Sequence, residues 1–304
     1  MSIVYSIERP DARALHVART VYSGVCHGTV GELLQGPFVR DNELHISIVS
    51  LPVRRYSWVH FSPGDDSNLD EDFATKPKSR RAMELYLSLN RRSLPGGRWT
   101  YDSELVQGKG MASSTADIVA TIRCLDAFFE TQSSPDLISA ILREIERSDS
   151  VFLEGHALYL SARQEVVHHF PANPRFHLCY IDEGEPVDTD AVGPALLAHY
   201  ERHLAAYLAN LDVAVRAFWD SNAADICRCA TRSAMLAQAI LPKRTLETLL
   251  SCQELYKADG VVVAHTGSLV GYVYIQRPTP REIGELSSFF RGLGYQCRFV
   301  ETGF

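Results

Sequence analysis

The stretch Val106-Gln107-Gly108-Lys109-Gly110-Met111-Ala112-Ser113-Ser114-Thr115-Ala116-Asp117 governs how the rest of this 304-residue chain is interpreted. Gly108 and Gly110 allow a tight turn and a close approach of the backbone to a ligand. The hydroxyl residues that follow can cap a helix start, and the apolar run after them predicts a buried helix over residues 114–131. A helix N-terminus attracts anions, so this stretch is a candidate phosphate-binding loop. The same residue types also serve simply to begin a helix.

Two further glycine-containing stretches accompany the loop. One is Cys26-His27-Gly28-Thr29-Val30-Gly31-Glu32-Leu33-Leu34-Gln35-Gly36, and the other is Val263-Ala264-His265-Thr266-Gly267-Ser268-Leu269-Val270-Gly271. With 110–116, they resemble the three ordered motifs of the GHMP kinases, most closely those of the L-threonine kinases of the PduX type. The chain contains no Walker A pattern, G-x-x-x-x-G-K-[ST]. Three motifs in order across most of a chain are far more specific than one.

The amino-acid composition indicates which class of protein this is and which kinds of partner are excluded. Hydrophobic residues make up 46% of the chain and charged residues 22%, as in an ordinary globular protein. The net charge of −7 argues against nucleic acid as a partner, and no apolar run reaches the roughly 18 residues of a membrane span. The seven cysteines, an odd number, are typical of a reducing compartment. We therefore expect a cytoplasmic protein that contacts neither nucleic acid nor membrane.

Strands and helices alternate in both halves, which predicts the α+β class with mixed or antiparallel sheets. The resemblance implies a two-part fold: a ribosomal-protein-like α/β half over residues 1–170 and a ferredoxin-like half over 171–304. Residues 26–36 are expected to form a turn or loop, and residues 62–78 an acidic surface loop. Strands are expected within 1–25 and at 43–49, 55–61, 98–106, 175–182, 260–264, 272–275 and 296–301, and helices at 79–89, 114–131, 135–147, 281–291 and across 193–257.

The resemblance implies ATP and Mg²⁺ as cofactors. It places Mg²⁺ on Ser114 and on a glutamate of a later helix. We choose Glu146 because the PduX-type pattern has a glutamate three residues before the next aspartate, which is Asp149 here. Helical spacing would put both carboxylates on one face. A solvated carboxylate beside Arg143 and Arg147 is the alternative for Glu146. Asp149 matches the aspartate that many GHMP kinases place near the acceptor hydroxyl, where it can act as a general base, or it simply ends the helix.

The remaining candidates concern phosphate and acceptor binding. Lys109 would supply positive charge at the β- and γ-phosphates, or is a solvated loop lysine; the first motif lacks the lysine that the family often carries there. Glu32 would bind a substrate ammonium or accept backbone N–H bonds. Arg54 or Arg55 would hold a substrate carboxylate as a bidentate pair, unless they lie at the surface. The candidates are, for catalysis, Asp149 and Lys109; for nucleotide, Gly108, Lys109, Gly110, Met111, Ala112, Ser113, Ser114 and Thr115; for metal, Ser114 and Glu146; and for substrate, Glu32, Arg55, Thr266 and Gly267.

The function that the resemblance implies is ATP-dependent phosphorylation of a small molecule, the side-chain hydroxyl of L-threonine. In cobalamin biosynthesis, such kinases supply O-phosphothreonine for the aminopropanol linker. One alternative is a GHMP kinase that acts on another hydroxy amino acid, an amino alcohol or a sugar. Another is a catalytically silent GHMP-fold protein that acts as a binding or regulatory module. The resemblance also allows a homodimer.

Overall fold

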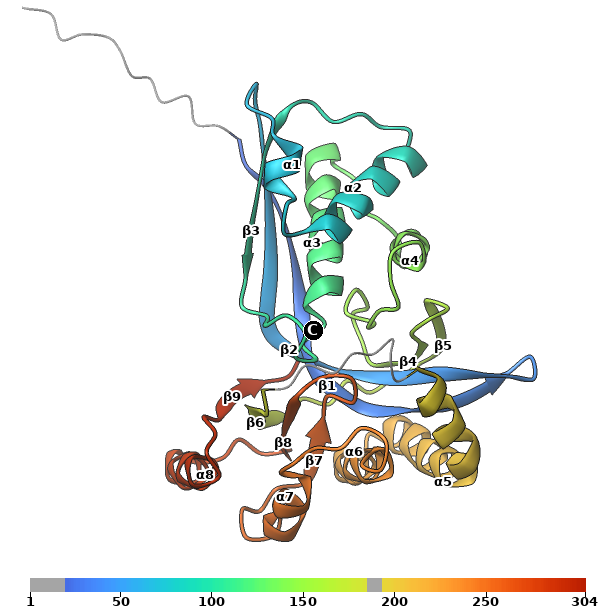
Figure 1. Cartoon of the computed structure of the whole chain (residues 1–304), viewed down its shortest axis with the longest axis vertical. Coiled ribbons are helices and arrows are strands. Elements are labelled where there is room, and N and C mark those ends of the chain that lie inside the picture. Colours follow the sequence, from blue (N-terminus) through green and yellow to red (C-terminus); the bar gives the residue numbers. More distant parts are fainter. Residues whose placement is uncertain (1–19, 185–192) are drawn as a thin grey trace, which may run out of the picture.

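A long β-hairpin organises the computed structural model, which describes residues 20–184 and 193–304. Strands β1 (Tyr22–Arg40) and β2 (Glu43–Pro63) pair antiparallel along nearly their whole length. Asp41 and Asn42 form the turn between them with φ angles of 53° and 61°, a conformation that these two residue types tolerate well. The hairpin bends midway and so runs through both parts of the molecule (Figure 1).

The hairpin corrects two predictions. Residues 26–36 were expected to form a turn or loop, but they lie inside β1, and the expected strands 43–49 and 55–61 are parts of one strand, β2. Register shifts next to Gly28 and on both sides of Glu32 interrupt the pairing of β1 with β2. Such bulges let a strand bend and twist without ending, which explains why glycine-rich sequence here does not break the strand.

The strands form one antiparallel-paired sheet with the order β5-β4-β2-β1-β7-β8-β6-β9, and β3 pairs with the far end of β2. The α+β prediction is confirmed. Most expected elements are present within a few residues. β4 was not expected, and the part of the strand prediction that covers residues 1–19 lies outside the described residues. The other strands are β3 (Gly97–Ser103), β4 (Ala157–Leu160), β5 (Glu165–His169), β6 (His177–Asp182), β7 (Gly260–Val263), β8 (Leu269–Tyr274) and β9 (Arg298–Glu301).

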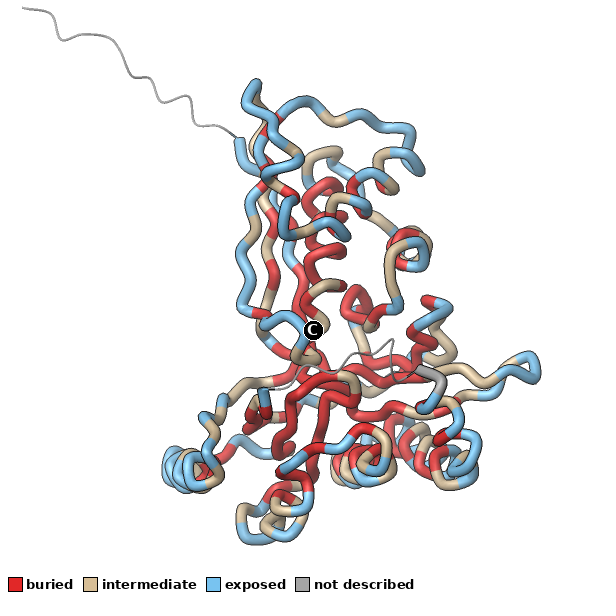
Figure 2. The backbone as a smooth tube through the Cα atoms, viewed as in Figure 1, coloured by how far each residue is buried: buried red, intermediate tan, exposed pale blue. Residues whose placement is uncertain are grey.

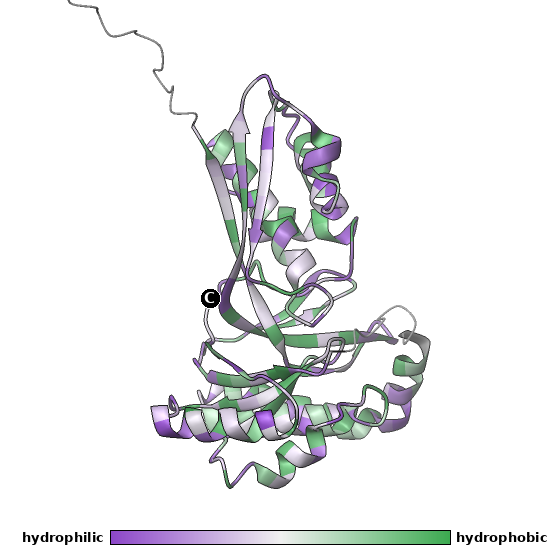
Figure 3. Cartoon of the chain, turned by 60° about the vertical axis from the view of Figure 1, so that its left-hand side comes forward, coloured by the Kyte–Doolittle hydropathy of each residue, from purple (hydrophilic) through white to green (hydrophobic). Residues whose placement is uncertain are grey.

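Helix α3 lies in the core of the upper part of the molecule in Figure 1, beside the upper end of the hairpin. Its residues Ile118, Val119 and Ile122 are fully buried, and buried backbone continues from it into the hairpin (Figure 2). Helices α5 to α8 cover one face of the strands at the other end (Figures 1 and 3). The helices are α1 (Leu69–Asp72), α2 (Pro77–Leu89), α3 (Ser113–Phe129), α4 (Pro135–Arg143), α5 (Gly193–Trp219), α6 (Ala223–Ala237), α7 (Leu246–Cys252) and α8 (Pro280–Gly292).

Two segments differ from their predicted structure in ways that affect the site. Helix α4 ends at Arg143 rather than at residue 147, so Glu146 and Asp149 lie in the connection that follows it. The expected surface loop 62–78 contains the short helix α1 and the first turn of α2, where Pro77 is the first helical residue. In the described part of the chain, none of the helices is long and apolar enough to cross a membrane.

Candidate active site

The loop before α3 presents backbone N–H groups at the start of a long buried helix. Ala112 occupies the N-cap position with a φ of 53°, and no side chain caps the helix. The prediction that hydroxyl side chains cap this helix is therefore wrong. Because no side chain occupies the first N–H groups, they remain available to an anion, which the partial positive charge of the helix N-terminus also attracts.

The third glycine-rich stretch packs directly under this loop. Gly110 has a φ of +91°, and a Cβ there would lie 2.2 Å from Cβ of Ala264. A Cβ on Gly267 would lie 2.2 Å from the carbonyl oxygen of Lys109, and the backbone N–H of Ser268 donates to that same oxygen at 3.1 Å. The first stretch contacts the loop as well, since Thr29 N–H donates to Met111 O at 3.1 Å. All three glycine-containing stretches therefore meet at the start of α3.

The hydroxyls at the start of α3 bind a carboxylate. Ser114 Oγ donates to Glu146 Oε2 at 2.9 Å, and Thr115 Oγ1 donates to Glu146 Oε1 at 2.8 Å. Lys78 Nζ, from the first turn of α2, contacts Glu146 Oε2 at 2.5 Å. The cluster of Lys78, Ser114, Thr115 and Glu146 thus joins three segments that are far apart in the sequence.

This cluster has the donor chemistry that Mg²⁺ requires beside a nucleotide. Across residues 20–184 and 193–304, no three or more His, Cys, Asp and Glu side chains gather in a way that could hold a metal ion alone. Mg²⁺ at nucleotide sites is commonly held by one or two carboxylates together with phosphate oxygens and water. The Glu146 carboxylate and the Ser114 hydroxyl, 2.9 Å apart, fit that arrangement.

Two cavities adjoin the cluster. One, of about 260 Å³, lies beside the glycine loop and is lined by Lys76, Gly108, Ser114 and Asp117 among others. The other, of about 450 Å³, is lined by Glu146 and by residues from β1 and the segment after α4. Lys78 lines both cavities. A molecule in one cavity can therefore approach a molecule in the other at the cluster.

The larger of these two, which we call the acceptor cavity, contains Asp149. Asp149 Oδ1 accepts a hydrogen bond from Ser50 Oγ at 2.9 Å. Burial, followed by the negative charge of Glu32, raises the pKa of Asp149 to about 7, while the Ser50 hydrogen bond and the charge of Arg147 oppose the rise. A carboxyl group with a pKa near neutrality can accept a proton from a hydroxyl and later release it.

The acceptor cavity also carries one cation and one anion with free bonding capacity. Glu32 is buried, and its Oε2 atom accepts bonds from the backbone N–H of His265 at 2.9 Å and from the His265 ring at 3.0 Å. Its Oε1 atom accepts no hydrogen bond from any residue within 20–184 and 193–304. Arg147 lines the same cavity, is exposed, and forms no ion pair with any described residue. Thr266 lies on the cavity wall.

Several candidates from the sequence line neither cavity, among them Lys109, Arg55 and Gly267. Lys109 Nζ donates to Gly184 O at 2.7 Å and pairs with Asp182 at 3.4 Å, and Lys109 lines neither cavity. Arg55 pairs with Glu104 at 2.8 Å and does not line the acceptor cavity. Nor does its neighbour Arg54, which pairs with Glu301.

Sequence reasoning did not identify Lys78 or Arg147 as site residues. Lys78 fell in the stretch expected to be a loop, although Pro77 beside it is a common first residue of a helix. Arg147 was considered only as a neighbour of Glu146. Its position two residues before Asp149 was the available signal, because a connecting segment that carries a buried carboxylate into a cavity also places adjacent side chains at that cavity.

Comparisons with known proteins show which proteins this chain resembles. Residues 79–155 match the model of the GHMP kinase N-terminal domain. The chain is 29% identical over 264 residues to an L-threonine kinase of Citrobacter freundii, covering 81% of this chain and 84% of that protein. It is 28% identical over 262 residues to an L-threonine kinase of Salmonella typhimurium, covering 81% and 80%. The predicted resemblance to GHMP kinases, and within them to L-threonine kinases, is confirmed.

Solved structures show the same fold. A mevalonate kinase of L. major in complex with R-mevalonate has a TM-score of 0.68 at 14% identity, covering 94% of this chain and 97% of that one. A homoserine kinase from Cytophaga hutchinsonii has a TM-score of 0.68 at 12% identity, covering 95% and 96%. The fold of this chain is therefore the GHMP kinase fold, as the three motifs predicted.

Proposed function

We propose that this protein is an ATP-dependent kinase that phosphorylates the side-chain hydroxyl of L-threonine, giving O-phospho-L-threonine and ADP. The similarity to two L-threonine kinases over about four-fifths of the chain supports this reaction. The observation that carries the proposal is the position of Asp149. Its carboxyl group, with a pKa near 7, lies in a cavity that meets the phosphate loop at the Lys78–Glu146 contact.

On the nucleotide side, the phosphates of ATP lie over the N-terminus of α3. The backbone N–H groups of the first turn bind phosphate oxygens, and Lys78 adds a positive charge from α2. Ser114 and Glu146 would hold Mg²⁺, which would neutralise charge on the phosphates. Lys109 is not required in this arrangement, since it pairs with Asp182 away from both cavities.

On the acceptor side, Asp149 takes the hydroxyl proton of threonine. As the oxygen forms its bond to the γ-phosphorus, the bond between that phosphorus and the bridging oxygen of ADP breaks. The proton moves to Asp149, whose pKa near 7 lets a large fraction of the group be ionised before the reaction and protonated after it. Ser50, which donates to Asp149 Oδ1, keeps the carboxylate oriented.

Charge in the cavity suits an amino-acid zwitterion. Glu32 offers its free Oε1 atom to the ammonium group, and Arg147 offers its guanidinium to the carboxylate. Arg147 thus takes the role that the sequence suggested for Arg55. Ile48 and Ile145 line the same cavity and provide an apolar surface for the methyl group of threonine. A buried methyl group is worth about 1–3 kcal/mol, or roughly 10–200-fold in rate, so serine is a poorer substrate but still a substrate.

The test is ADP release with L-threonine, L-serine, L-homoserine, ethanolamine, a sugar panel and N-acetyl-L-threonine at fixed Mg²⁺ and ATP. We expect the fastest turnover with threonine and a turnover about 10–200-fold slower with serine. N-acetylthreonine should not be phosphorylated, because it leaves Glu32 unpaired. Turnover only with a sugar or amino alcohol would refute the threonine assignment and leave the kinase reaction standing. No turnover with any acceptor would favour a silent GHMP-fold protein. The cobalamin link and the cytoplasmic location stay predictions.

A further inference from the structure

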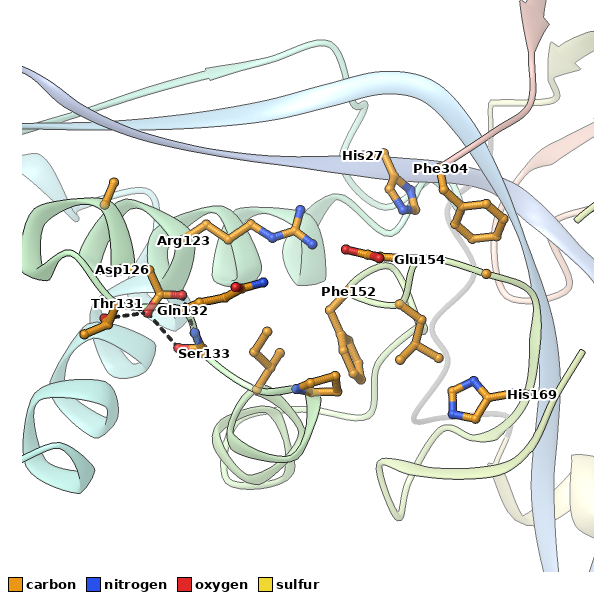
Figure 4. A pocket seen from close by; sticks show the side chains of 15 residues that line it. His27, Arg123, Asp126, Thr131, Gln132, Ser133, Phe152, Glu154, His169 and Phe304 are labelled. Atoms are coloured by element: carbon orange, nitrogen blue, oxygen red, sulfur yellow. Dashed lines mark hydrogen bonds between the residues drawn. The ribbon is translucent and has the colours of Figure 1, made fainter. Parts of the chain in front are cut away.

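A third cavity, of about 930 Å³, shares no lining residue with the nucleotide and acceptor cavities. It lies along the C-terminal half of α3, whereas the phosphate loop lies at the N-terminal end of the same helix. Its walls come from α3, α4 and the connection between them, and from the segment around residue 153, with His27 of β1, His169 of β5 and Phe304 (Figure 4). We call it the α3 cavity. Pockets of roughly 300–1,000 Å³ hold small-molecule ligands.

Polar groups with free bonding capacity converge on one side of the α3 cavity. His27 is more than nine-tenths buried; its Nδ1 atom lies 3.1 Å from Gly28 O, and its Nε2 atom has no hydrogen-bond partner. Burial lowers the pKa of His27, so its ring is neutral at pH 7. A buried polar atom without a partner is rare in folded proteins and calls for a ligand or an ordered water.

On this side of the cavity, the side chains of Arg123 and Glu154 point toward each other without forming an ion pair. Figure 4 shows the guanidinium of Arg123 and the carboxylate of Glu154 directed toward the same space, with His27 beside them. Arg123 Nη1 donates to Val25 O at 2.8 Å, and its other nitrogens form no bond with a described residue. Glu154 is exposed and, within residues 20–184 and 193–304, has no hydrogen bond or ion pair. Opposite charges held apart in this way match a ligand that carries both signs.

The other side of the cavity is mainly apolar, with His169 at its edge. Phe152, Leu153 and Ile138 are buried residues that line it, and Phe304 contributes a half-exposed ring. Asp126 lines the cavity too, but it already accepts bonds from Tyr86, Thr131 and Ser133 and has little capacity left for a ligand. A ligand therefore needs a compact charged head and a large apolar body.

The geometry points to a second small-molecule site in the α3 cavity, specific for an α-amino acid with an aromatic or large aliphatic side chain. Arg123 binds its carboxylate and Glu154 binds its ammonium group. His27 Nε2, as the unprotonated nitrogen of a neutral ring, accepts a hydrogen bond from the ammonium group. The side chain packs on Phe152 and Ile138. This site is separate from the proposed threonine site, and its existence does not depend on the kinase reaction.

The test is titration calorimetry of the full chain with L-phenylalanine, L-tryptophan and L-leucine in the absence of ATP. Two truncated probes separate the charges: phenethylamine lacks the carboxylate, and 3-phenylpropionate lacks the ammonium group. We expect the amino acids to bind and each truncated probe to bind at least tenfold more weakly, because each leaves one charged side chain unpaired. Equal binding of 3-phenylpropionate and L-phenylalanine, or no binding of any amino acid, would overturn the proposal.

Variants locate the binding. Glu154→Gln is nearly isosteric at an exposed position, so the fold is expected to persist. This variant should weaken the binding of L-phenylalanine at least tenfold, and Arg123→Gln should do the same. Arg281→Gln, on the exposed face of α8, is the matched control and should leave binding unchanged. Arg147→Gln reports on the acceptor cavity. If it abolishes binding and Glu154→Gln does not, the amino acid occupies the acceptor cavity and the α3 site does not exist. Failure to phosphorylate threonine would change none of these outcomes.

Discussion

Asp149→Asn separates a general base from a carboxylate with only a structural role. Asn keeps the shape of the side chain, and its carbonyl oxygen can still accept the hydrogen bond from Ser50 Oγ. It cannot accept a proton. We therefore expect turnover with threonine to fall by about 10²–10⁴, the usual contribution of a general base, while the affinity for ATP is unchanged.

The same substitution should stabilise the fold at alkaline pH. The folded-state pKa of Asp149 is raised from the 3.8 of a solvated aspartate to about 7. Between these values the unfolded chain has already released the proton that the folded chain still binds, so Asp149 makes the free energy of unfolding decrease as pH rises. A tenfold change in proton affinity corresponds to about 1.4 kcal/mol. The destabilisation that Asp149 causes above pH 7 therefore has an upper bound of about 4 kcal/mol. Because the group lines an open cavity, we expect about 1–2 kcal/mol.

Two measurements test both expectations. Urea unfolding at pH 5 and pH 8 gives the free energy of unfolding of both proteins. The value for Asp149→Asn should exceed that of the unsubstituted chain by more at pH 8 than at pH 5. The kcat/KM of the unsubstituted enzyme should rise with pH and level off above about pH 7, and this inflection should vanish in the variant. A loss of activity below tenfold, with the inflection retained, would refute the assignment of Asp149 as the base.

Three further substitutions probe the phosphate loop and the acceptor cavity. Ser114→Ala should lower turnover by orders of magnitude at limiting Mg²⁺ and change the melting temperature little, since Ser114 does not cap α3; normal turnover at limiting Mg²⁺ would remove Ser114 from the metal site. Gly110→Val should abolish ATP binding measured by calorimetry, because its Cβ would lie 2.2 Å from Ala264 Cβ at a φ of +91°; unchanged affinity would place the nucleotide elsewhere. Arg147→Gln should raise the KM for threonine at least tenfold with a smaller effect on kcat. Arg55→Gln is its matched control, and an equal effect of both would refute the carboxylate assignment.

The glycine turn and the buried helix that follows it were predictable because the signal there is local. Glycines, hydroxyl residues and an apolar helix follow one another within a dozen residues, so adjacent positions carry the whole signal. The same local reasoning failed for β1. Glycines in residues 26–36 indicated a turn, but the strand persists because β2 supplies partners along the other side and bulges absorb the irregular residues. The persistence of a strand depends on its partner, which local sequence does not show.

The acceptor cavity was predictable only in part for the same physical reason. Glu32, Asp149 and Thr266 were found through motifs, and the structure places all three on one cavity. Arg55 was chosen because it follows the strand expected at residues 43–49, yet its guanidinium is paired with Glu104 outside the cavity. Arg147 reaches the cavity because α4 ends four residues earlier, at Arg143. No periodicity in the sequence indicated that early end.

In the proposed mechanism, recognition of the zwitterion and tuning of the base are coupled in this cavity. The negative charge of Glu32 raises the pKa of Asp149, and the positive charge of Arg147 lowers it. A bound ammonium group offsets the first effect, and a bound carboxylate offsets the second. A zwitterion does both, so the pKa of Asp149 stays near its value in the free enzyme.

Acceptors with a single charge disturb this balance. An amino alcohol such as ethanolamine would bring a cation without an anion, lower the pKa of Asp149, and so weaken it as a base. A hydroxy acid would bring an anion without a cation, raise the pKa, and leave Asp149 protonated at neutral pH. Both acceptors should therefore react more slowly in the chemical step as well as bind more weakly. For the hydroxy acid, the loss of rate should shrink as pH rises. The cavity thus discriminates through the base itself, beyond what the Arg147 and Glu32 contacts supply.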